Sequence, residues 1–370
     1  MKIGILTLPF NNNYGGYLQA MALTSVLERM GHEVILVNRR YTIYTGLKNN
    51  IIFSLKAIVK KCLGQDTKII RSKQIVYAYE KKGSLMLPIV RKVIKNFTLP
   101  IYSQEDFKML EGKNIDAYIV GSDQIWRPRY VPRVQNFYLD FLEDCYKGKR
   151  IAYAASFGTD KDEYSEDLKT ECGVLIERFD AVSVREDSAL NLIQSFKWNC
   201  RNLQQVLDPT MLLKADEYTK WISKKSDVTR NYVASYILDS NTEKAKMTSI
   251  ISSRLNYKLL PLGTVHNGVK DSMDSWLSGI KDSQFVVTDS FHGMVFCIIF
   301  NRPFAIIVNE QRGSSRFYSL LKKFGLESRI LKSKDEINTL LNDNINWRYV
   351  NEVVEKEAKT SLHFLESALS

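Results

Sequence analysis

Short apolar runs alternate with segments of helical periodicity along most of this chain, and this alternation restricts the fold more than any other feature. "KIGILTL" from Lys2 and "HEVILVN" from His32 are typical of buried strands, and "YLQAMALTSVLERMG" between them places apolar residues at helical spacing. A strand, a helix and a strand in this order predict a βαβ unit, whose right-handed crossover implies a parallel sheet.

The same alternation returns in the second half of the chain. Four apolar runs, "YVASYIL", "KLLPLG", "QFVVTDS" and "PFAIIVN", are separated by "EKAKMTSIISSRL", "SMDSWLSGI" and "GMVFCIIF", which have helical character. The sequence therefore predicts an α/β fold of two doubly wound domains that face a cleft. We place the first domain at residues 1–207, with a basic helical insertion at about 39–113, and the second at 208–345. Residues 346–370 are expected to form a helix that packs back on the first domain.

The charge of the chain limits its partners. Lys and Arg number 52 against 41 Asp and Glu, a formal net charge of +11, which favours a nucleic acid, a phosphorylated substrate or an anionic lipid surface. The basic residues gather in one helical region at about 39–113 without a known nucleic-acid-binding module, so we expect no nucleic-acid partner. A solvated helical face is the simplest interpretation of this region, and peripheral contact with a membrane is the alternative.

Cysteine usage and hydropathy favour the cytoplasm. The five cysteines stand apart, without CxxC or Cys/His spacing, so we expect neither a disulfide framework nor a metal site. The N-terminal apolar run is too short for a signal peptide, and no apolar stretch approaches the roughly 20 residues of a membrane span. We therefore expect a cytoplasmic protein that contacts a membrane, if at all, at its inner face.

Ligands of open parallel sheets bind at the carboxyl ends of the strands. Five such ends form one set of candidates: residues 9–16, 121–126, 156–158, 185–186 and 208–210. Within or beside these ends, the residues expected to line the cleft or contact an acceptor substrate are Asn13, Tyr14, Gly15, Gly16, Ser122, Trp126 and Ser156. The glycine pair either relieves a tight turn capped by Asn13 or cradles a ligand. Asp123 is either a helix cap, or a base or a ligand of a hydroxyl group.

The stretch "VVTDSFHGMVFCIIF" sets His292 where a strand turns into a helix. Asp289 or Ser290 is expected to cap that helix, which leaves His292 in its first turn. The N–H groups and the positive end of a helix favour an anion, so a phosphate or carboxylate is expected beside Ser290, Phe291 and Gly293. A packed histidine with satisfied nitrogens is the alternative, but its place at a strand's carboxyl edge favours a functional role.

Arginines near other strand ends fit the same anion. Arg185 in "SVRED" suits a carboxylate or phosphate through two parallel hydrogen bonds, and an ion pair with Glu186 or Asp187 is the alternative. Arg312 and Arg316 in "EQRGSSRF" begin a further helix and are placed to close on that anion, although a solvated helix face is the simpler interpretation of Arg312. The first βα turn is not GxGxxG, so we expect no nicotinamide cofactor, and no other cofactor is indicated.

Several of these motifs, in their order along the chain, resemble the polysaccharide pyruvyl transferase family: "NNNYGGYLQAMAL", "VGSDQIW", "SVRED", "DPTMLL", "FVVTDSFHGMVFCIIFNRPF" and "SSRFYSLLKKFGL". The resemblance runs from near residue 1 to about residue 330, and "TDSFHG" is its most specific part. The family typically has alanine where Gly16 stands. The resemblance implies a GT-B-like fold of two Rossmann-like domains around a cleft. It also implies transfer of a pyruvyl group from phosphoenolpyruvate onto two hydroxyls of a sugar, with a cyclic ketal and phosphate as products.

Roles for single residues follow from the resemblance. In related proteins the histidine that matches His292, and an arginine of the kind of Arg185, are linked to donor binding or catalysis. We expect His292 to protonate the methylene carbon of phosphoenolpyruvate and Asp123 to accept the proton of the attacking hydroxyl. Tyr14 and Trp126 either stack on a sugar ring or belong to the core. The expected acceptor is a sugar or oligosaccharide of a capsule or exopolysaccharide, free, polymeric or lipid-linked.

Two other functions fit the same architecture. One is a GT-B glycosyltransferase that uses a nucleotide sugar, and incubation with phosphoenolpyruvate against nucleotide sugars separates it from a pyruvyl transferase. The other is a glycan-binding module without turnover.

Overall fold

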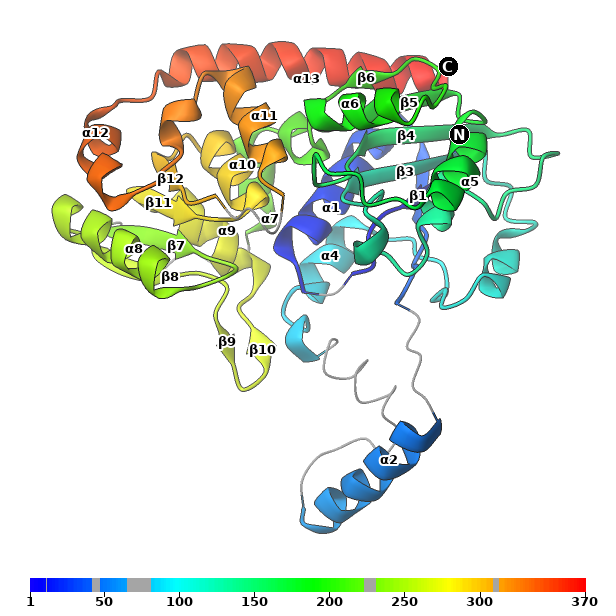
Figure 1. Ribbon diagram of the computed structural model, residues 1–370, viewed down its shortest axis with the longest axis horizontal. Coiled ribbons are helices and arrows are strands. Elements are labelled where there is room, and N and C mark those ends of the chain that lie inside the picture. The colour runs from blue at the N-terminus through cyan, green and yellow to red at the C-terminus, as the bar shows by residue number, and fades with distance from the viewer. Residues whose placement is uncertain (11, 42–46, 65–80, 223–230, 309–312) are drawn as a thin grey trace.

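The computed structural model describes residues 1–10, 12–41, 47–64, 81–222, 231–308 and 313–370, and places them in two α/β domains (Figure 1). The first domain has a six-stranded parallel sheet in the order β2-β1-β3-β4-β5-β6. Its strands are β1 (Lys2–Leu6), β2 (Glu33–Leu36), β3 (Ala117–Asp123), β4 (Lys149–Ala155), β5 (Ala181–Val184) and β6 (Gln204–Gln205). The predicted βαβ unit is confirmed, because β1 and β2 pair in parallel on either side of one helix.

The helices of the first domain are α1 (Tyr14–Arg29), α2 (Leu47–Cys62), α4 (Leu87–Val93), α5 (Glu166–Ile176) and α6 (Asp187–Ser195). The next helix, α7 (Ala215–Trp221), packs against the second domain, where the ring of Tyr218 lies 4.8 Å from that of Phe296. α1 is buried along most of its length because its first thirteen positions, apart from Ser25, face protein on every side. α2 lies apart from both sheets (Figure 1).

The second domain has a four-stranded parallel sheet in the order β12-β11-β7-β8. Its strands are β7 (Tyr232–Tyr236), β8 (Lys258–Pro261), β11 (Phe285–Thr288) and β12 (Phe304–Ile306), and its helices are α8 (Thr242–Leu255), α9 (Met273–Lys281), α10 (Phe291–Ile299), α11 (Ser315–Phe324) and α12 (Ile337–Asn342). All four predicted strands are present. A short antiparallel hairpin, β9 (Val265–His266) and β10 (Val269–Lys270), was not predicted.

The last helix, α13 (Trp347–Leu369), runs along one edge of the molecule over both domains (Figure 1). Near its end the ring of Phe364 packs 6.1 Å from that of Tyr153 in β4, and the hydroxyl of Ser361 accepts a hydrogen bond from Leu207 N–H at 2.9 Å. The chain thus returns to the first sheet. The exact domain boundaries at 207 and 345 stay a prediction.

Strand order fixes where a ligand is expected. In each sheet the order reverses at one place, between β1 and β3 in the first and between β7 and β11 in the second. Such a reversal opens a crevice at the carboxyl ends of the two strands. Asp123 ends β3, and α10 with His292 follows β11, so the two reversals carry the residues singled out in the sequence.

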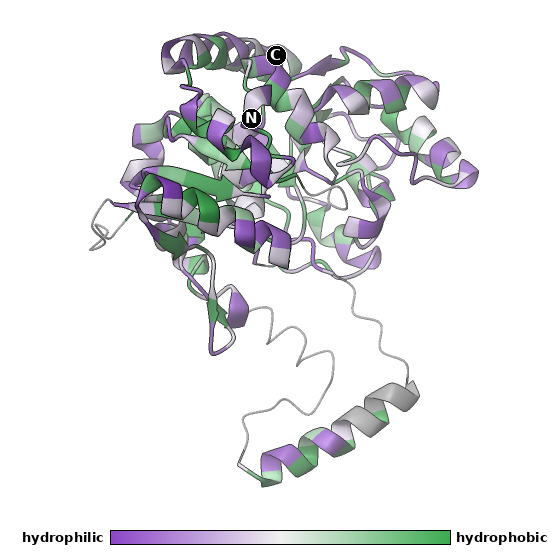
Figure 2. Cartoon of the chain, turned by 60° about the vertical axis from the view of Figure 1, so that its left-hand side comes forward, coloured by the Kyte–Doolittle hydropathy of each residue, from purple (hydrophilic) through white to green (hydrophobic). Residues whose placement is uncertain are grey.

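Hydrophobic residues concentrate in the strands and on the inner faces of the helices (Figure 2). The largest core continues from α1 of the first domain into α10 of the second. Within the part of the chain that the structure describes, no helix has the length and apolar character to span a membrane.

Candidate active site

His292 is the second residue of α10, a helix that starts directly behind the second sheet. Ser290 caps this helix, because its hydroxyl accepts a hydrogen bond from Gly293 N–H at 3.3 Å. Asp289, the other expected cap, instead pairs with Lys244 Nζ at 2.7 Å. The side chain of His292 is only 6% exposed, so the ring belongs to the interior at the start of a helix.

The N-terminus of α1 faces His292 from the first domain. Asn13 caps α1 through a hydrogen bond from Gly15 N–H to its side-chain oxygen at 3.2 Å. A Cβ on Gly15 would lie 2.0 Å from Nδ1 of His292, so only glycine lets the ring pack there. A Cβ on Gly16 would meet nothing closer than Asn13 at 3.9 Å, which leaves room for an alanine. Of the two glycines, Gly15 is therefore required to accommodate the His292 ring, and Gly16 is not.

Asp208 is the carboxylate on which the site converges, and it is fully buried. Its Oδ2 accepts hydrogen bonds from Nη1 of Arg185 at 2.8 Å and from the hydroxyl of Ser122 at 3.2 Å. The same oxygen lies 3.5 Å from Nε2 of His292, which makes no hydrogen bond within the described residues. Oδ1 accepts hydrogen bonds from the N–H and the hydroxyl of Thr210.

These contacts decide the ionisation of Asp208. Burial alone would raise its pKa, but the interactions with His292, Arg185 and Thr210 outweigh burial and hold the pKa of Asp208 well below its usual range. Asp208 is therefore a permanent carboxylate that ties the histidine of the second domain to the arginine of the first.

Arg185 joins Asp208 to two further carboxylates. Its Nη2 lies 3.3 Å from Asp123 Oδ1, and its Nε lies 3.7 Å from Glu186 Oε2. Its guanidinium carbon is 4.4 Å from the centroid of the Phe291 ring. Burial would lower the pKa of Arg185, but the three carboxylates outweigh burial and raise it. The ion pair with Glu186, one of the two roles considered for Arg185, is thus present.

Ser156 enters the same network through Glu186. Its hydroxyl donates to Glu186 Oε1 at 2.7 Å, and the N–H of Gly158 donates to both side chains. Ser156 N–H also donates to the carbonyl of Asp123 at 3.1 Å. Asp123 has φ 75°, in the left-handed region that Asp tolerates better than most residues. It ends a strand and caps no helix, and its carboxylate is engaged by Arg185.

Arg316, the second residue of α11, brings a second guanidinium to Phe291. Its guanidinium carbon lies 5.4 Å from the ring centroid, and the ring of His292 packs edge-to-face on Phe291 at 5.4 Å. Burial first, and repulsion from Arg185 second, lower the pKa of Arg316 to about 10. Two buried guanidiniums and the histidine therefore surround one aromatic ring. Arg312 lies outside the described residues.

The two aromatic residues considered for sugar stacking are interior, which corrects that interpretation. The ring of Tyr14 stacks on Trp276 at 5.1 Å and its hydroxyl donates to the carbonyl of Asp271 at 2.5 Å. The indole of Trp126 stacks on Tyr138 at 5.1 Å with an angle of 6° between the rings. Both side chains are fully buried. Burying a large aromatic ring stabilises the folded protein, so both rings pack into the core.

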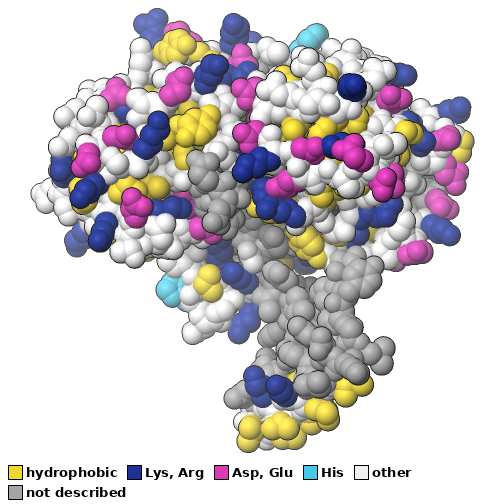
Figure 3. Space-filling model, viewed as in Figure 1, with side chains coloured by type: hydrophobic (Ala, Val, Ile, Leu, Met, Phe, Trp, Pro, Cys, Tyr) yellow, Lys and Arg dark blue, Asp and Glu magenta, His cyan; other side chains and the backbone are white. Residues whose placement is uncertain are grey.

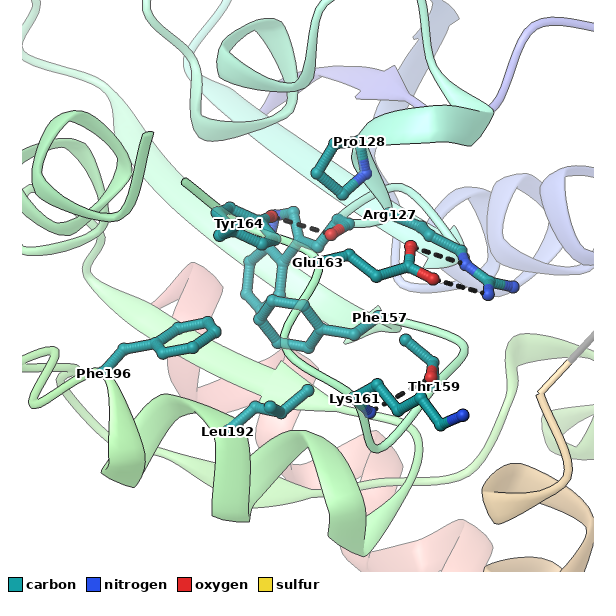
Figure 4. A pocket seen from close by; sticks show the side chains of 10 residues that line it. Arg127, Pro128, Phe157, Thr159, Lys161, Glu163, Tyr164, Leu192 and Phe196 are labelled. Carbon is teal, nitrogen blue, oxygen red and sulfur yellow. Dashed lines mark hydrogen bonds and ion pairs between the residues drawn. The ribbon is translucent and has the colours of Figure 1, made fainter. Parts of the chain in front are cut away.

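A small hollow lies beside Trp126, and Figure 4 shows the side chains that line it. Arg127 and Glu163 form a two-pronged ion pair at its rim, with Nη2 and Oε1 2.9 Å apart. The space does not admit a water molecule. The other lining residues are Trp126, Pro128, Phe157, Thr159, Lys161, Tyr164, Leu192 and Phe196. This hollow is therefore a packing seam of the first domain, not a ligand site.

Sequence reasoning placed residues 185–186 and 208–210 at the sheet edge, but it considered Glu186 only as an ion-pair partner of Arg185 and assigned no role to Asp208. The signal for Asp208 is present in "VLDPT", where a carboxylate directly follows an apolar run and precedes a proline. A buried arginine at the neighbouring strand end requires a carboxylate partner, but Asp123, Glu186 and Asp208 all lie at strand ends, so the sequence offers Asp208 as one candidate among several.

Comparisons with known proteins give a family and a fold. A model of the polysaccharide pyruvyl transferase family matches residues 13–311, and no curated protein matches the chain. UDP-GlcNAc 2-epimerase from Methanocaldococcus jannaschii is similar in structure, with a TM-score of 0.58 and 11% identity over 98% of this chain and 100% of that chain.

Two further solved structures are similar over their whole length. UDP-GlcNAc 2-epimerase from Neisseria meningitidis, bound to UDP-GlcNAc, has a TM-score of 0.57 and 8% identity over 100% of this chain and 99% of that chain. UGT89C1 from Arabidopsis thaliana, complexed with quercetin, has a TM-score of 0.51 and 10% identity over 99% of both chains. At these identities the likeness concerns the fold alone. The expected GT-B-like fold of two Rossmann-like domains is confirmed.

Proposed function

The chain belongs to the polysaccharide pyruvyl transferase family, and we propose that it moves the pyruvyl group of phosphoenolpyruvate onto two hydroxyls of a sugar, forming a cyclic ketal and releasing phosphate. The family itself supports a transferase of polysaccharide biosynthesis. The observation that carries the finer proposal is the meeting of His292 with Arg185 and Arg316 around Phe291. This arrangement offers a small anionic donor both positive charge and a proton.

Phosphoenolpyruvate carries a phosphate and a carboxylate, and the site has complementary groups for each. The start of α10, where Ser290 is the cap, favours an anion through the helix dipole. A guanidinium holds a phosphate or carboxylate through two parallel hydrogen bonds. Because burial lowers the pKa of Arg316 to about 10, a bound anion would stabilise its charge.

In the proposed reaction His292 transfers a proton to the methylene carbon, and the π electrons of the double bond form the new C–H bond. The carbon that bears the phosphate oxygen becomes cationic, a sugar hydroxyl attacks it, and Asp123 takes the hydroxyl proton. Phosphate leaves with the electrons of its C–O bond, and a second hydroxyl closes the ketal. The second hydroxyl's proton restores His292, and the proton on Asp123 leaves with phosphate.

Asp208 would act through His292. Its Oδ2, 3.5 Å from Nε2, holds the ring in place and stabilises its positive charge before proton transfer. Asp208 is therefore a positioning residue in this scheme, and it fixes Arg185 at the same time.

The proposal extends to the setting of the reaction. Phosphoenolpyruvate is a cytoplasmic metabolite, so the reaction belongs in the cytoplasm. The acceptor is a sugar of a capsule or exopolysaccharide precursor, and we propose that it is lipid-linked and met at a membrane, from the surface described below. No cofactor and no metal take part in the scheme.

Mass spectrometry tests the reaction. The full-length protein is incubated with phosphoenolpyruvate and a panel of sugar acceptors, and we expect a pyruvyl ketal together with one phosphate per ketal. The His292→Gln protein provides the background rate. Nucleotide sugars replace phosphoenolpyruvate in a parallel series, and sugar transfer without ketal formation across the panel would overturn the proposal in favour of a glycosyltransferase of the same fold.

A second measurement needs no acceptor. A ligand that binds only the folded protein raises its melting temperature. We expect phosphoenolpyruvate to do so at concentrations at which phosphate or pyruvate alone does not. Stabilisation by glycans alone, without any effect of phosphoenolpyruvate, would instead indicate a glycan-binding module.

A further inference from the structure

An apolar stripe on α2 stands uncovered. Five large hydrophobic side chains on this helix or directly after it are between 43% and 73% exposed: Ile51, Leu55, Ile58, Val59 and Leu63. The first four follow the spacing i, i+4, i+7 and i+8, which places them on one face of a helix. In Figure 3 hydrophobic side chains gather at the outer surface of this helix, away from the two domains.

Lysines border the stripe. Lys56, Lys60 and Lys61 are exposed, dark blue side chains lie beside the hydrophobic ones in Figure 3, and the sequence of α2 contains no Asp or Glu. Residues 39–113 hold 16 of the chain's 52 Lys and Arg but only 5 of its 41 Asp and Glu, an excess of 11 that equals the formal net charge of the whole chain. The rest of the chain is electrically balanced, so the positive charge is a property of this one region.

We propose that α2 docks on an anionic lipid bilayer, with the apolar stripe in the interface and the lysines at the headgroups. A helix of this kind, with an apolar face and a lysine-rich polar face, is typical of binding to a membrane surface. The core of a protein–protein interface is, by contrast, depleted of lysine. The concentration of the entire net charge beside the stripe matches a surface of one charge sign, which a bilayer with anionic lipids offers.

The proposed membrane-facing side of the molecule is connected to the candidate active site through the β9–β10 hairpin. α2 and the β9–β10 hairpin extend from the same side of the molecule (Figures 1 and 2). A Cβ on Gly268 at the hairpin tip would lie 3.8 Å from Cε of Lys81 in the basic region. Lys270 of the hairpin donates a hydrogen bond to the carbonyl of Asn12 at 3.1 Å, directly before the helix whose Gly15 faces His292. A lipid-linked sugar held at the membrane is thus on the side from which α1 begins.

Co-sedimentation with vesicles tests the docking and does not depend on pyruvyl transfer. The full-length protein is mixed with vesicles of phosphatidylcholine alone or of phosphatidylcholine with phosphatidylglycerol, at low and high salt. We expect binding to the anionic vesicles at low salt, and weaker binding in high salt or on neutral vesicles. No binding to anionic vesicles at low salt would overturn the proposal.

Matched variants distinguish a specific role of the stripe in vesicle binding from a general effect of removing exposed apolar side chains. Leu55→Ser/Val59→Ser removes side chains that are 61% and 59% exposed, and Val174→Ser/Leu259→Ser removes two that are 54% and 40% exposed elsewhere. We expect the first variant to bind vesicles at least about tenfold more weakly and the second to bind like the wild type. Equal effects of the two would refute a role of the stripe. Melting temperatures confirm that both remain folded.

The charge contribution has its own pair of variants. Lys56→Gln/Lys60→Gln/Lys61→Gln is compared with Lys332→Gln/Lys356→Gln/Lys359→Gln, in which exposed lysines elsewhere are changed and the net charge falls equally. We expect roughly 100-fold weaker binding for the first variant at low salt, and a much smaller loss for the second. Light scattering provides a further check: a wild-type dimer that the stripe variant abolishes would assign α2 to a second copy of the chain and overturn docking on lipid.

Discussion

A methyl group added at Gly15 should displace His292 and slow the proposed reaction without unfolding the protein. The Cβ of Gly15→Ala would lie 2.0 Å from Nδ1, 2.3 Å from Cγ and 2.6 Å from Cε1 of His292. Contacts of this kind are comfortable only near 3.4 Å, so the ring must move by about 1.4 Å. A shift of this size carries Nε2 away from Asp208, from which it is now 3.5 Å distant.

The expected losses follow from this displacement. A misplacement of about 1 Å in a catalytic site reduces the rate by roughly 100-fold, so we expect kcat to fall by about that factor. Overpacking destabilises by about 1–3 kcal/mol, and the change from glycine to alanine within α1 returns about 0.5–1 kcal/mol. The net loss of stability is therefore small, and the protein stays folded at room temperature.

Gly16→Ala is the matched control, because its Cβ meets nothing closer than 3.9 Å. Phosphate release from phosphoenolpyruvate in the presence of an acceptor gives kcat for both variants, and thermal unfolding gives their stability. Gly16→Ala should keep the wild-type kcat and melt at the same or a slightly higher temperature. Wild-type kcat in Gly15→Ala, or an equal loss in both variants, would refute the assignment of His292 to the reaction.

His292→Gln keeps a hydrogen-bonding side chain but removes the proton donor, so single-turnover rates should fall by roughly 100-fold or more while the melting temperature changes little; a folded and fully active variant would exclude the histidine from the mechanism. Arg316→Lys would remove the two-pronged contact that we propose with the donor, so the KM for phosphoenolpyruvate should rise more than the KM for the acceptor in steady-state kinetics; a rise confined to the acceptor would contradict this role of Arg316. Asp208→Asn leaves the buried guanidinium of Arg185 short of a carboxylate, which should cost about 3–5 kcal/mol in denaturant unfolding. Because the pKa of Asp208 is depressed by folding, its stabilising contribution is fully present above about pH 4 and is lost as the pH falls further. The acid limb of the wild-type stability profile should therefore be steeper than that of Asp208→Asn.

The sequence could predict the position of the site because parallel strands place their carboxyl ends at one edge. Ser122, Arg185 and Asp208 end or follow separate strands of the first sheet, and their side chains meet as that rule requires. The cap at Ser290 and the place of His292 in the first turn of a helix also follow from local residue preferences.

Contacts between residues far apart in the sequence could not be predicted from local residue preferences. An aromatic residue after a strand can face a ligand or the core, and only the partners at distant positions, such as Trp276 for Tyr14, decide between them. The choice of Asp208 as the partner of Arg185 is equally non-local. The β9–β10 hairpin, by contrast, could have been predicted from the sequence. Its two-residue turn of Asn267 and Gly268, with φ of 50° and 78°, has a recognisable sequence signal in "HNG".

The sequence treated Arg185 and Arg316 alike, as cations for the donor, and the structure separates them. Three carboxylates outweigh burial and raise the pKa of Arg185, so its charge is already compensated within the protein. Burial first and the neighbouring arginine second lower the pKa of Arg316 to about 10, although Asp123 and Glu186 act to raise it, so an arriving anion would further stabilise its charged form. Both guanidiniums lie on Phe291, beside His292. We therefore infer that Arg185 fixes the geometry of Asp208 and the histidine, whereas Arg316 meets the donor.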